Sequence, residues 1–203
     1  MAPYIATCGG DLDAALALHQ WNTEISGAFY ETLSTFEVIL RNALHNQLAI
    51  RHASRVGEGE WYDDPEGVFE DRAREDIAKA RDGLARRGRD ETPGGVVAEL
   101  NLGFWRFLLS QRYTTTLWPQ ALSNAFPNRP DDVRRQEIDA EVRKLHLLRN
   151  RIAHQEPIHR GWDLEARHGG VLRLTKYISQ EAFVWLGGHS RIAAVLAARP
   201  TCA

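Results

Sequence analysis

Arg149, Asn150 and His154 bring phosphate-binding and acid–base side chains together in the segment LHLLRNRIAHQEPI, residues 145–158. Leucines at helical spacing predict that this segment is the end of a helix, which Pro157 must terminate. Asn150 and His154 are four residues apart and share one face, where Asn150 can accept the Nδ1–H of His154 and leave Nε2 free as a base. A nearby arginine can stabilise charge that builds on a phosphate. These are the groups that transesterification of RNA without a metal requires.

Arg149 and His154 do not share a face in a regular helix. Their separation of five residues is about 500° of rotation, which leaves the two side chains about 140° apart. Two arrangements would bring them to one site. Either the last turn loosens before Pro157, or two copies of the helix meet across a dimer.

The surroundings of this segment are basic, although the whole chain has a formal net charge of −2. Between residues 143 and 160 a single acid, Glu156, stands against five basic residues: Arg143, Lys144, Arg149, Arg151 and Arg160. A local excess of positive charge is a candidate phosphate contact. The alternative is a solvated helix face without a function.

Other residues that could form a site give weaker signals. Glu37, Arg41 and His45 recur every four residues, which predicts either a polar pocket or a Glu37–Arg41 ion pair with a neighbouring histidine. The eight histidines show no spacing typical of metal ligands, so we expect no metal and no cofactor. Cys8 and Cys202 indicate neither a disulfide framework nor a zinc site. Four tryptophans fall in apolar stripes and are expected in the core: Trp21, Trp105, Trp118 and Trp185.

The composition is that of an ordinary globular protein. A chain of 203 residues suits a single domain, residues 1–203, and 43% hydrophobic with 26% charged residues is typical of soluble proteins. No stretch approaches the ~18 apolar residues of a membrane span, so no membrane association is expected. The first residues, MAPYIATCGGDLD, lack the basic and apolar regions of a signal peptide, which favours a cytoplasmic location.

Helical periodicity runs through the chain, and no window shows the alternation of a strand, so we expect an all-α bundle. In the first half of the chain, helices are predicted over residues 12–52 (with a kink or second cap at Asn22-Thr23), over 66–88, and from Thr92-Pro93 onward with a break or kink near Asn101 to Gly103. In the second half they are predicted over Thr114–Phe126, from an Asp131 cap to His154, over 162–178, from a Ser179 cap to 186, and from Ser190 to 199.

RNRIAHQEPI resembles the Arg-(polar)-x-x-x-His signature of HEPN domains, in the form carried by Abi-like (abortive infection) proteins. The long segment WNTEISGAFYETLSTFEVILRNALHNQL is similar to the first helices of that family and contains its Glu-x-x-x-Arg-Asn pattern as Glu37, Arg41 and Asn42. VVAELNLGFWRFLL, LWPQALSNAFP and ISQEAFVWL resemble later segments, so the likeness extends over about residues 11–200. One departure is Gln155, where family members often have a second histidine.

The resemblance implies a HEPN-type helical bundle, with a four-helix core and additional helices, that forms a homodimer. Two Arg-x-x-x-x-His motifs would then face each other and make a composite ribonuclease site. Arg149 and His154 would be catalytic, with Asn150 orienting, while Arg41, Asn42 and Arg151 would be substrate-binding. The implied partners are RNA and an antitoxin or regulatory protein, and the implied role is anti-phage defence or growth arrest as a toxin.

Two other interpretations remain open at this stage. The same basic surface, without catalysis, would bind RNA, a nucleotide or a partner protein, as some HEPN domains do. Alternatively, Arg149 and His154 pair with acids such as Glu37 or Glu156 inside a dimer interface and serve the structure alone.

Overall fold

Every regular element of the structure, a computed structural model that describes residues 1–202, is a helix. The all-α class expected from the sequence is confirmed. None of the described helices is long and apolar enough to cross a membrane. The helices are α1 (Ala2–Thr7), α2 (Leu12–Arg55), α3 (Asp71–Arg86), α4 (Pro93–Glu99), α5 (Leu102–Leu108), α6 (Leu117–Gln120), α7 (Arg135–Ala153), α8 (Leu164–Ile178), α9 (Gln180–His189) and α10 (Ile192–Ala197), with the 3-10 turns η1 (Trp61–Asp63), η2 (Gln111–Tyr113) and η3 (Leu122–Ala125).

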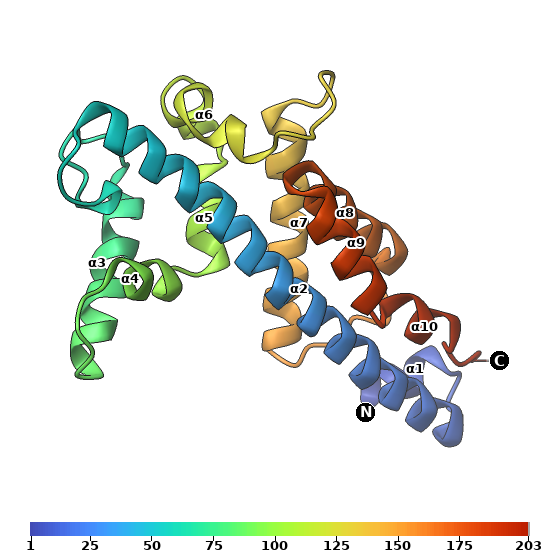
Figure 1. Cartoon of the computed structure of the whole chain (residues 1–203). Coiled ribbons are helices and arrows are strands. Elements are labelled where there is room, and N and C mark those ends of the chain that lie inside the picture. The colour runs from blue at the N-terminus through green and yellow to red at the C-terminus, as the bar shows by residue number, and fades with distance from the viewer. Residues whose placement is uncertain (203) are drawn as a thin grey trace.

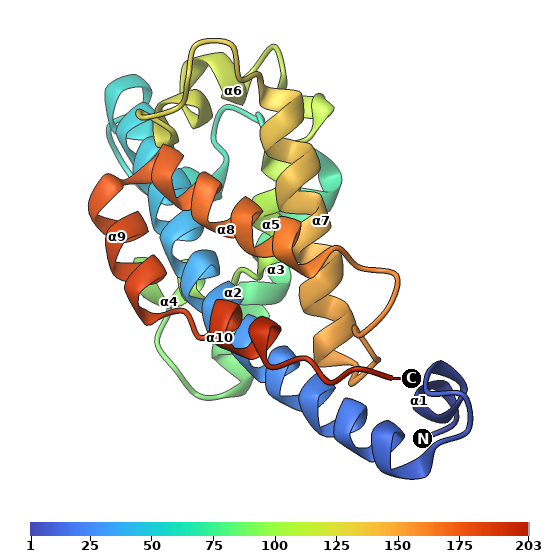
Figure 2. The ribbon, with the colours of Figure 1, turned by 90° about the vertical axis from the view of Figure 1, so that its right-hand side faces the viewer.

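The long helix α2 is the central element (Figure 1 and Figure 2). The helices that pack along it are α1, α5, α7, α8, α9 and α10. Asp11 caps its start by accepting the backbone N–H groups of Asp13 and Ala14. The apolar stripe expected from the sequence is buried along the whole helix: Ile25, Phe29, Leu33, Phe36, Leu40, Leu44 and Leu48. One face of α2 is therefore core from end to end.

The kink or second cap expected at Asn22-Thr23 is wrong, because α2 continues without interruption through both residues. The side-chain oxygen of Asn22 instead accepts the backbone N–H groups of Ile158 and His159 at 2.8 and 3.0 Å. Thr23 donates its hydroxyl to the carbonyl of His19 within the same helix. Asn22 thus ties the central helix to the chain that follows α7.

The helices α5, α7 and α8 contact α2 and complete the core around it. Figure 1 shows α3 and α4 on one side of α2, with α8 and α9 on the other. α7 begins at Arg135 and not at the expected Asp131 cap, because a turn between Pro130 and Val133 comes first. Its inward face is apolar and consists of Ile138, Val142, Leu145 and Leu148.

The helix expected over residues 66–88 begins later, at Asp71. Gly67 adopts a left-handed conformation with φ 62°, and the carboxylate of Asp64 accepts the backbone N–H groups of Val68 and Phe69. These hydrogen bonds hold a turn that places the Phe69 ring in the core. The cap predicted at Thr92 is confirmed, since its hydroxyl accepts the N–H of Gly95 at the start of α4.

The segment Thr114–Phe126 is not the single helix that its spacing predicts. Proline is tolerated only in the first turn of a helix, and Pro119 therefore restricts this segment to the four residues of α6, followed by η3. Leu117, Leu122 and Phe126 are nevertheless buried, so the prediction of which residues face the core is confirmed.

The C-terminal helices follow the sequence more closely. The side chain of Ser179 accepts the N–H of Ala182 and caps α9, as expected. Trp21 and Trp105 are buried and Trp118 is half-buried, but the expectation for Trp185 is wrong. Trp185 is 53% exposed, because α9 is apolar on both faces and turns Leu186 toward the core instead.

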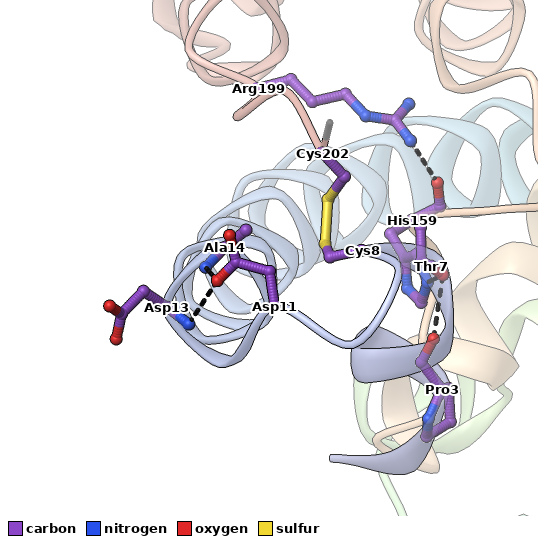
Figure 3. Close-up of a disulfide and its surroundings, with 9 residues drawn as sticks. All are labelled: Pro3, Thr7, Cys8, Asp11, Asp13, Ala14, His159, Arg199 and Cys202. Carbon is purple, nitrogen blue, oxygen red and sulfur yellow. Dashed lines mark hydrogen bonds between the residues drawn. A yellow bond between two sulfur atoms is a disulfide. The ribbon is translucent and has the colours of Figure 1, made fainter.

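Cys8 and Cys202 form a disulfide bond, which joins the segment after α1 to the C-terminal segment (Figure 3). The expectation of no disulfide is wrong, because only the fold brings two cysteines 194 residues apart to a Cα–Cα distance of 4.7 Å. His159 lies beside this bond: its Nε2 is 3.2 Å from the hydroxyl of Thr7, and its carbonyl accepts a hydrogen bond from Arg199 at 2.7 Å. Both ends of the chain are thus fastened to the loop that follows α7.

Candidate functional site

The C-terminal end of α7 is tightly closed. Gln155 adopts a left-handed conformation with φ 58° directly after the helix. Two backbone hydrogen bonds complete a Schellman motif there, from Gln155 to Ile152 at 2.9 Å and from Glu156 to Arg151 at 3.0 Å. The N–H of His154 still reaches the carbonyl of Asn150 at 2.9 Å, so the last turn does not loosen. Arg149 and His154 stay on different faces, and the first of the two arrangements considered for them is wrong.

Arg149 is held on the side of α7 that faces α2 and α5. Its Nη2 lies 3.9 Å from Oε2 of Glu37 on α2, and its side chain keeps 33% of its surface exposed. The other carboxylate oxygen of Glu37 accepts the N–H of Leu102, at the start of α5, at 2.9 Å. Glu37 therefore joins three helices and positions Arg149 without covering it.

The Glu37–Arg41 ion pair expected from the sequence is not formed in residues 1–202. The Arg41 guanidinium donates instead to the carbonyl of Ala98 at the end of α4, at 3.4 Å. The third member of the group, His45, accepts the indole N–H of Trp61 through Nδ1 at 2.9 Å. The three side chains contact three different parts of the fold and form no common pocket.

Asn150 does not orient His154. Its amide nitrogen lies 3.2 Å from Nε2 of His146, one turn earlier in α7. His146 is half-buried, and burial lowers its pKa, as do the positive charges of Arg106, Arg149 and Arg72. Its surroundings therefore favour the neutral form of the His146 imidazole.

His154 is exposed at the end of α7, and its ring makes no hydrogen bond or salt bridge to any residue that the structure describes. The ring is therefore available to a ligand or to a second copy of the chain.

The residues expected to bind substrate lie apart from one another. Arg41 reaches α4, and Asn42 is exposed on the outer face of α2. Arg151 donates to the carbonyl of Pro157 at 2.8 Å and forms a salt bridge with Glu156 at 3.0 Å. Arg151 thus holds the loop after α7, which is a structural role.

α7 turns an uncovered stripe toward solvent. It contains residues at alternating spacings of four and three, namely Gln136, Ala140, Arg143, Leu147, Asn150 and His154. Asn150 is half-buried and the others are exposed, with Leu147 keeping 49% of its surface accessible. Spacings of this kind give a helix a face suited to packing against another helix.

Within residues 1–202, no three His, Cys, Asp or Glu side chains gather where they could hold a metal ion. The polar site that does exist lies between α2, α5 and α7 and is made by Glu37, His146, Arg149 and Asn150.

His146 is the member of this site that sequence reasoning missed. The signal was present, because His146, Asn150 and His154 recur every four residues along one side of α7. Reading the spacing in both directions from Asn150 would have given two candidate partners.

No protein-family model, curated protein or solved structure matches this chain. The chemistry of the site must therefore be inferred from the residues that form it. The resemblance to HEPN domains remains a prediction from the sequence.

Proposed function

We propose that this protein is a metal-independent endoribonuclease of the HEPN type, which acts as a homodimer with a composite site. The observation that carries the proposal is the separation of Arg149 from His154 on a helix whose end is rigid. His154 is exposed at the end of α7, and Arg149 is anchored on another face through Glu37. A second copy supplies the missing partner for each.

The exposed stripe of α7 supports the dimeric arrangement. Leu147 lies in its middle, and Arg143 and Asn150 flank it. Two such stripes packed against each other would bury both leucines and bring the His154 ring of one subunit close to the other subunit. We also propose that the helices around α2 include the four-helix core of a HEPN domain.

In the proposed reaction, Nε2 of His154 takes the proton from a ribose 2′-hydroxyl, and the 2′-oxygen attacks the adjacent phosphorus. The bond from phosphorus to the 5′-oxygen breaks, that oxygen takes up a proton from water, and His154 gives its proton back to the solvent. The products are a 2′,3′-cyclic phosphate and a 5′-hydroxyl end. Arg149 stabilises the charge on the pentacoordinate phosphorus, which requires its guanidinium to turn from Glu37 toward the phosphate.

The setting of the proposal is a cytoplasmic toxin or anti-phage protein, held in check by an antitoxin or regulatory partner. Its support is the likeness to Abi-like proteins. The disulfide between Cys8 and Cys202 is an observation against the cytoplasmic part, since such bonds are rare in reducing compartments.

The direct test is cleavage of total RNA and tRNA by the purified protein in EDTA. We expect wild type to leave 2′,3′-cyclic phosphate ends and His154→Ala to lose at least about a hundredfold in rate, the usual contribution of a general base. The matched control is His189→Ala, an exposed histidine at the end of α9, which should keep the wild-type rate. Equal cleavage by wild type and His154→Ala would refute the assignment of the base.

A second candidate function is binding without catalysis. The exposed basic groups around α7 favour it, because they attract phosphates whether or not His154 reacts. Tight RNA binding by wild type and His154→Ala, with no cleavage by either, would favour this function.

A further inference from the structure

An open cleft of about 820 Å³ lies beside the candidate site, between the start of α3, the end of α5, η2 and α7. Its lining includes Arg72, Arg106, Phe107 and Ser110. A cleft of this size accommodates a nucleotide unit. None of the sequence motifs pointed to it, because its side chains come from separate segments of the chain.

The acids of the cleft have arginine partners, although Oδ1 of Asp139 is buried without a hydrogen-bond partner in the part of the chain that the structure describes. Each of the three lies within salt-bridge distance of one: Glu70 of Arg112 at 3.3 Å, Asp71 of Arg74 at 2.7 Å and Asp139 of Arg135 at 3.5 Å. Within residues 1–202, Arg72 and Arg106 make no salt bridge and no side-chain hydrogen bond. The unpaired charge of the cleft is therefore positive.

Arg106 is the central group of this surplus. Its guanidinium is half-buried, which lowers its pKa; the nearby Asp139 raises the pKa, and Arg72 and Arg143 lower it. A half-buried cation without a partner is costly, and a bound anion would offset that cost. The hydroxyl of Ser110 is also buried without a hydrogen-bond partner. Both groups suit a phosphate oxygen.

The Phe107 ring is buried under Arg72, so it supports the guanidinium and offers no open face of its own. The guanidinium of Arg72 lies 4.9 Å from the centre of the Phe107 ring. Arginine planes and aromatic rings are the surfaces on which unpaired bases stack in complexes with single-stranded RNA. The exposed plane of Arg72 is therefore the stacking surface of the cleft, and it favours a nucleic-acid phosphate over an inorganic one.

The cleft is electrostatically continuous with the candidate catalytic residues. Besides burial, the positive charges of Arg106 and Arg72 in the cleft and of Arg149 in the site all lower the pKa of His146. His146 also packs against α5, where a side chain at Gly103 would come within 3.5 Å of its Nε2. The cleft and Arg149 thus border the same histidine, which is the reason for placing one strand of RNA across both.

We propose that Arg72 and Arg106 bind a phosphodiester of single-stranded RNA in this cleft, next to the phosphate that is cleaved. The inference rests on the proposed function and adds a second phosphate site to it. The same chemistry would hold the phosphate of a free nucleotide, so the test includes both ligands.

The experiment measures the binding of a fluorescent, fully 2′-O-methylated single-stranded RNA by anisotropy at several salt concentrations. This RNA cannot be cleaved, because the attacking hydroxyl is blocked. We expect Arg106→Gln and Arg72→Gln each to weaken binding about tenfold and to reduce the slope of log K against log salt by about 1. Arg89→Gln removes an exposed arginine from the turn after α3 and should bind within about twofold of wild type.

Two results would overturn the inference. One is unchanged RNA affinity in both Arg106→Gln and Arg72→Gln. Near-UV circular dichroism checks the fold of each variant, and the exposed Arg72 offers a change with little risk to folding. The other is a mononucleotide that competes as strongly as the RNA, which would assign the cleft to a free nucleotide.

The inference and the proposed function can fail separately. Loss of RNA binding in the two variants, with no cleavage by wild type, would keep the cleft and reject the nuclease. Cleavage by wild type with unchanged binding in both variants would keep the nuclease and reject the cleft.

Discussion

Replacing Glu37 by alanine removes a carboxylate that joins α2, α5 and α7. In the native structure its Oε1 accepts the backbone N–H of Leu102 at 2.9 Å, and its Oε2 lies 3.9 Å from Arg149. The side chain of Glu37 is only 16% exposed, so water replaces these contacts poorly. We expect Glu37→Ala to destabilise the fold, and Glu37→Gln to do so less.

The two contacts of Glu37 differ in size. A hydrogen bond from a backbone N–H to a charged acceptor is worth about 1.5–3 kcal/mol. The long contact to Arg149, which is one-third exposed and screened by solvent, contributes less than about 1 kcal/mol. Glu37→Ala should therefore lower the free energy of unfolding by about 2–3 kcal/mol. Glu37→Gln keeps an oxygen acceptor for Leu102 and should lose about half as much.

The assay is urea unfolding followed by far-UV circular dichroism at pH 7. Glu24→Ala is the matched control, because Glu24 is exposed on the same helix and should change the free energy of unfolding by less than about 0.5 kcal/mol. If Glu37→Ala unfolds at the midpoint of the control, the role of Glu37 in joining the helices is refuted. If Glu37→Gln lowers the free energy of unfolding as much as Glu37→Ala does, the ionic contact of Glu37 with Arg149 contributes more to stability than the hydrogen bond from Leu102.

Two further predictions concern stability. The disulfide between Cys8 and Cys202 closes a loop of 194 residues, for which a chain-entropy model gives a stabilisation of up to about 5 kcal/mol. The Cys8→Ser/Cys202→Ser double variant should therefore unfold at a clearly lower urea concentration. Equal urea midpoints for oxidised wild type and this variant would contradict the prediction. Burial lowers the pKa of four histidines, namely His45, His146, His159 and His168. Below about pH 6.5 the unfolded chain therefore binds more protons than the folded chain, so the urea midpoint should fall from pH 7.5 to 5.5. An unchanged midpoint would contradict the burial of these rings, and His146→Gln should show a smaller fall than wild type.

The parts of the fold that the sequence predicted well depend on local signals. The stripe of α2 and the caps at Thr92 and Ser179 need only neighbouring residues, and all three are confirmed. The absence of strands follows from the same periodicity in the described residues.

The errors arise where a side chain has a distant partner. Asn22 looked like a helix cap but serves the loop after α7, 136 residues away. Cys8 and Cys202 looked unrelated, because no sequence pattern reports that the two ends of the chain meet. Long-range pairing of this kind is decided by packing and lies outside what local spacing can predict.

The error at the candidate site has a geometric cause. Asn150 had a histidine four residues away on either side, and the sequence reading chose His154. Side chains of a helix lean toward its N-terminus, which directs Asn150 back to His146. His154 is the cap residue at the end of the helix, with φ −87° and ψ 9°, and its ring makes no hydrogen bond to Asn150. The sequence singled out Arg149 and Asn150, missed His146, and could not show which of these side chains touch.

Subunit mixing tests the central claim, that Arg149 and His154 act together across two copies of the chain. Arg149→Ala and His154→Ala would each be purified, then mixed under conditions that exchange subunits, and RNA cleavage in EDTA measured. Each variant alone should be inactive, whereas mixed dimers regain one intact site of two, for about a quarter of wild-type activity overall. A mixture of confirmed mixed dimers that stays as inactive as its components would contradict the composite site.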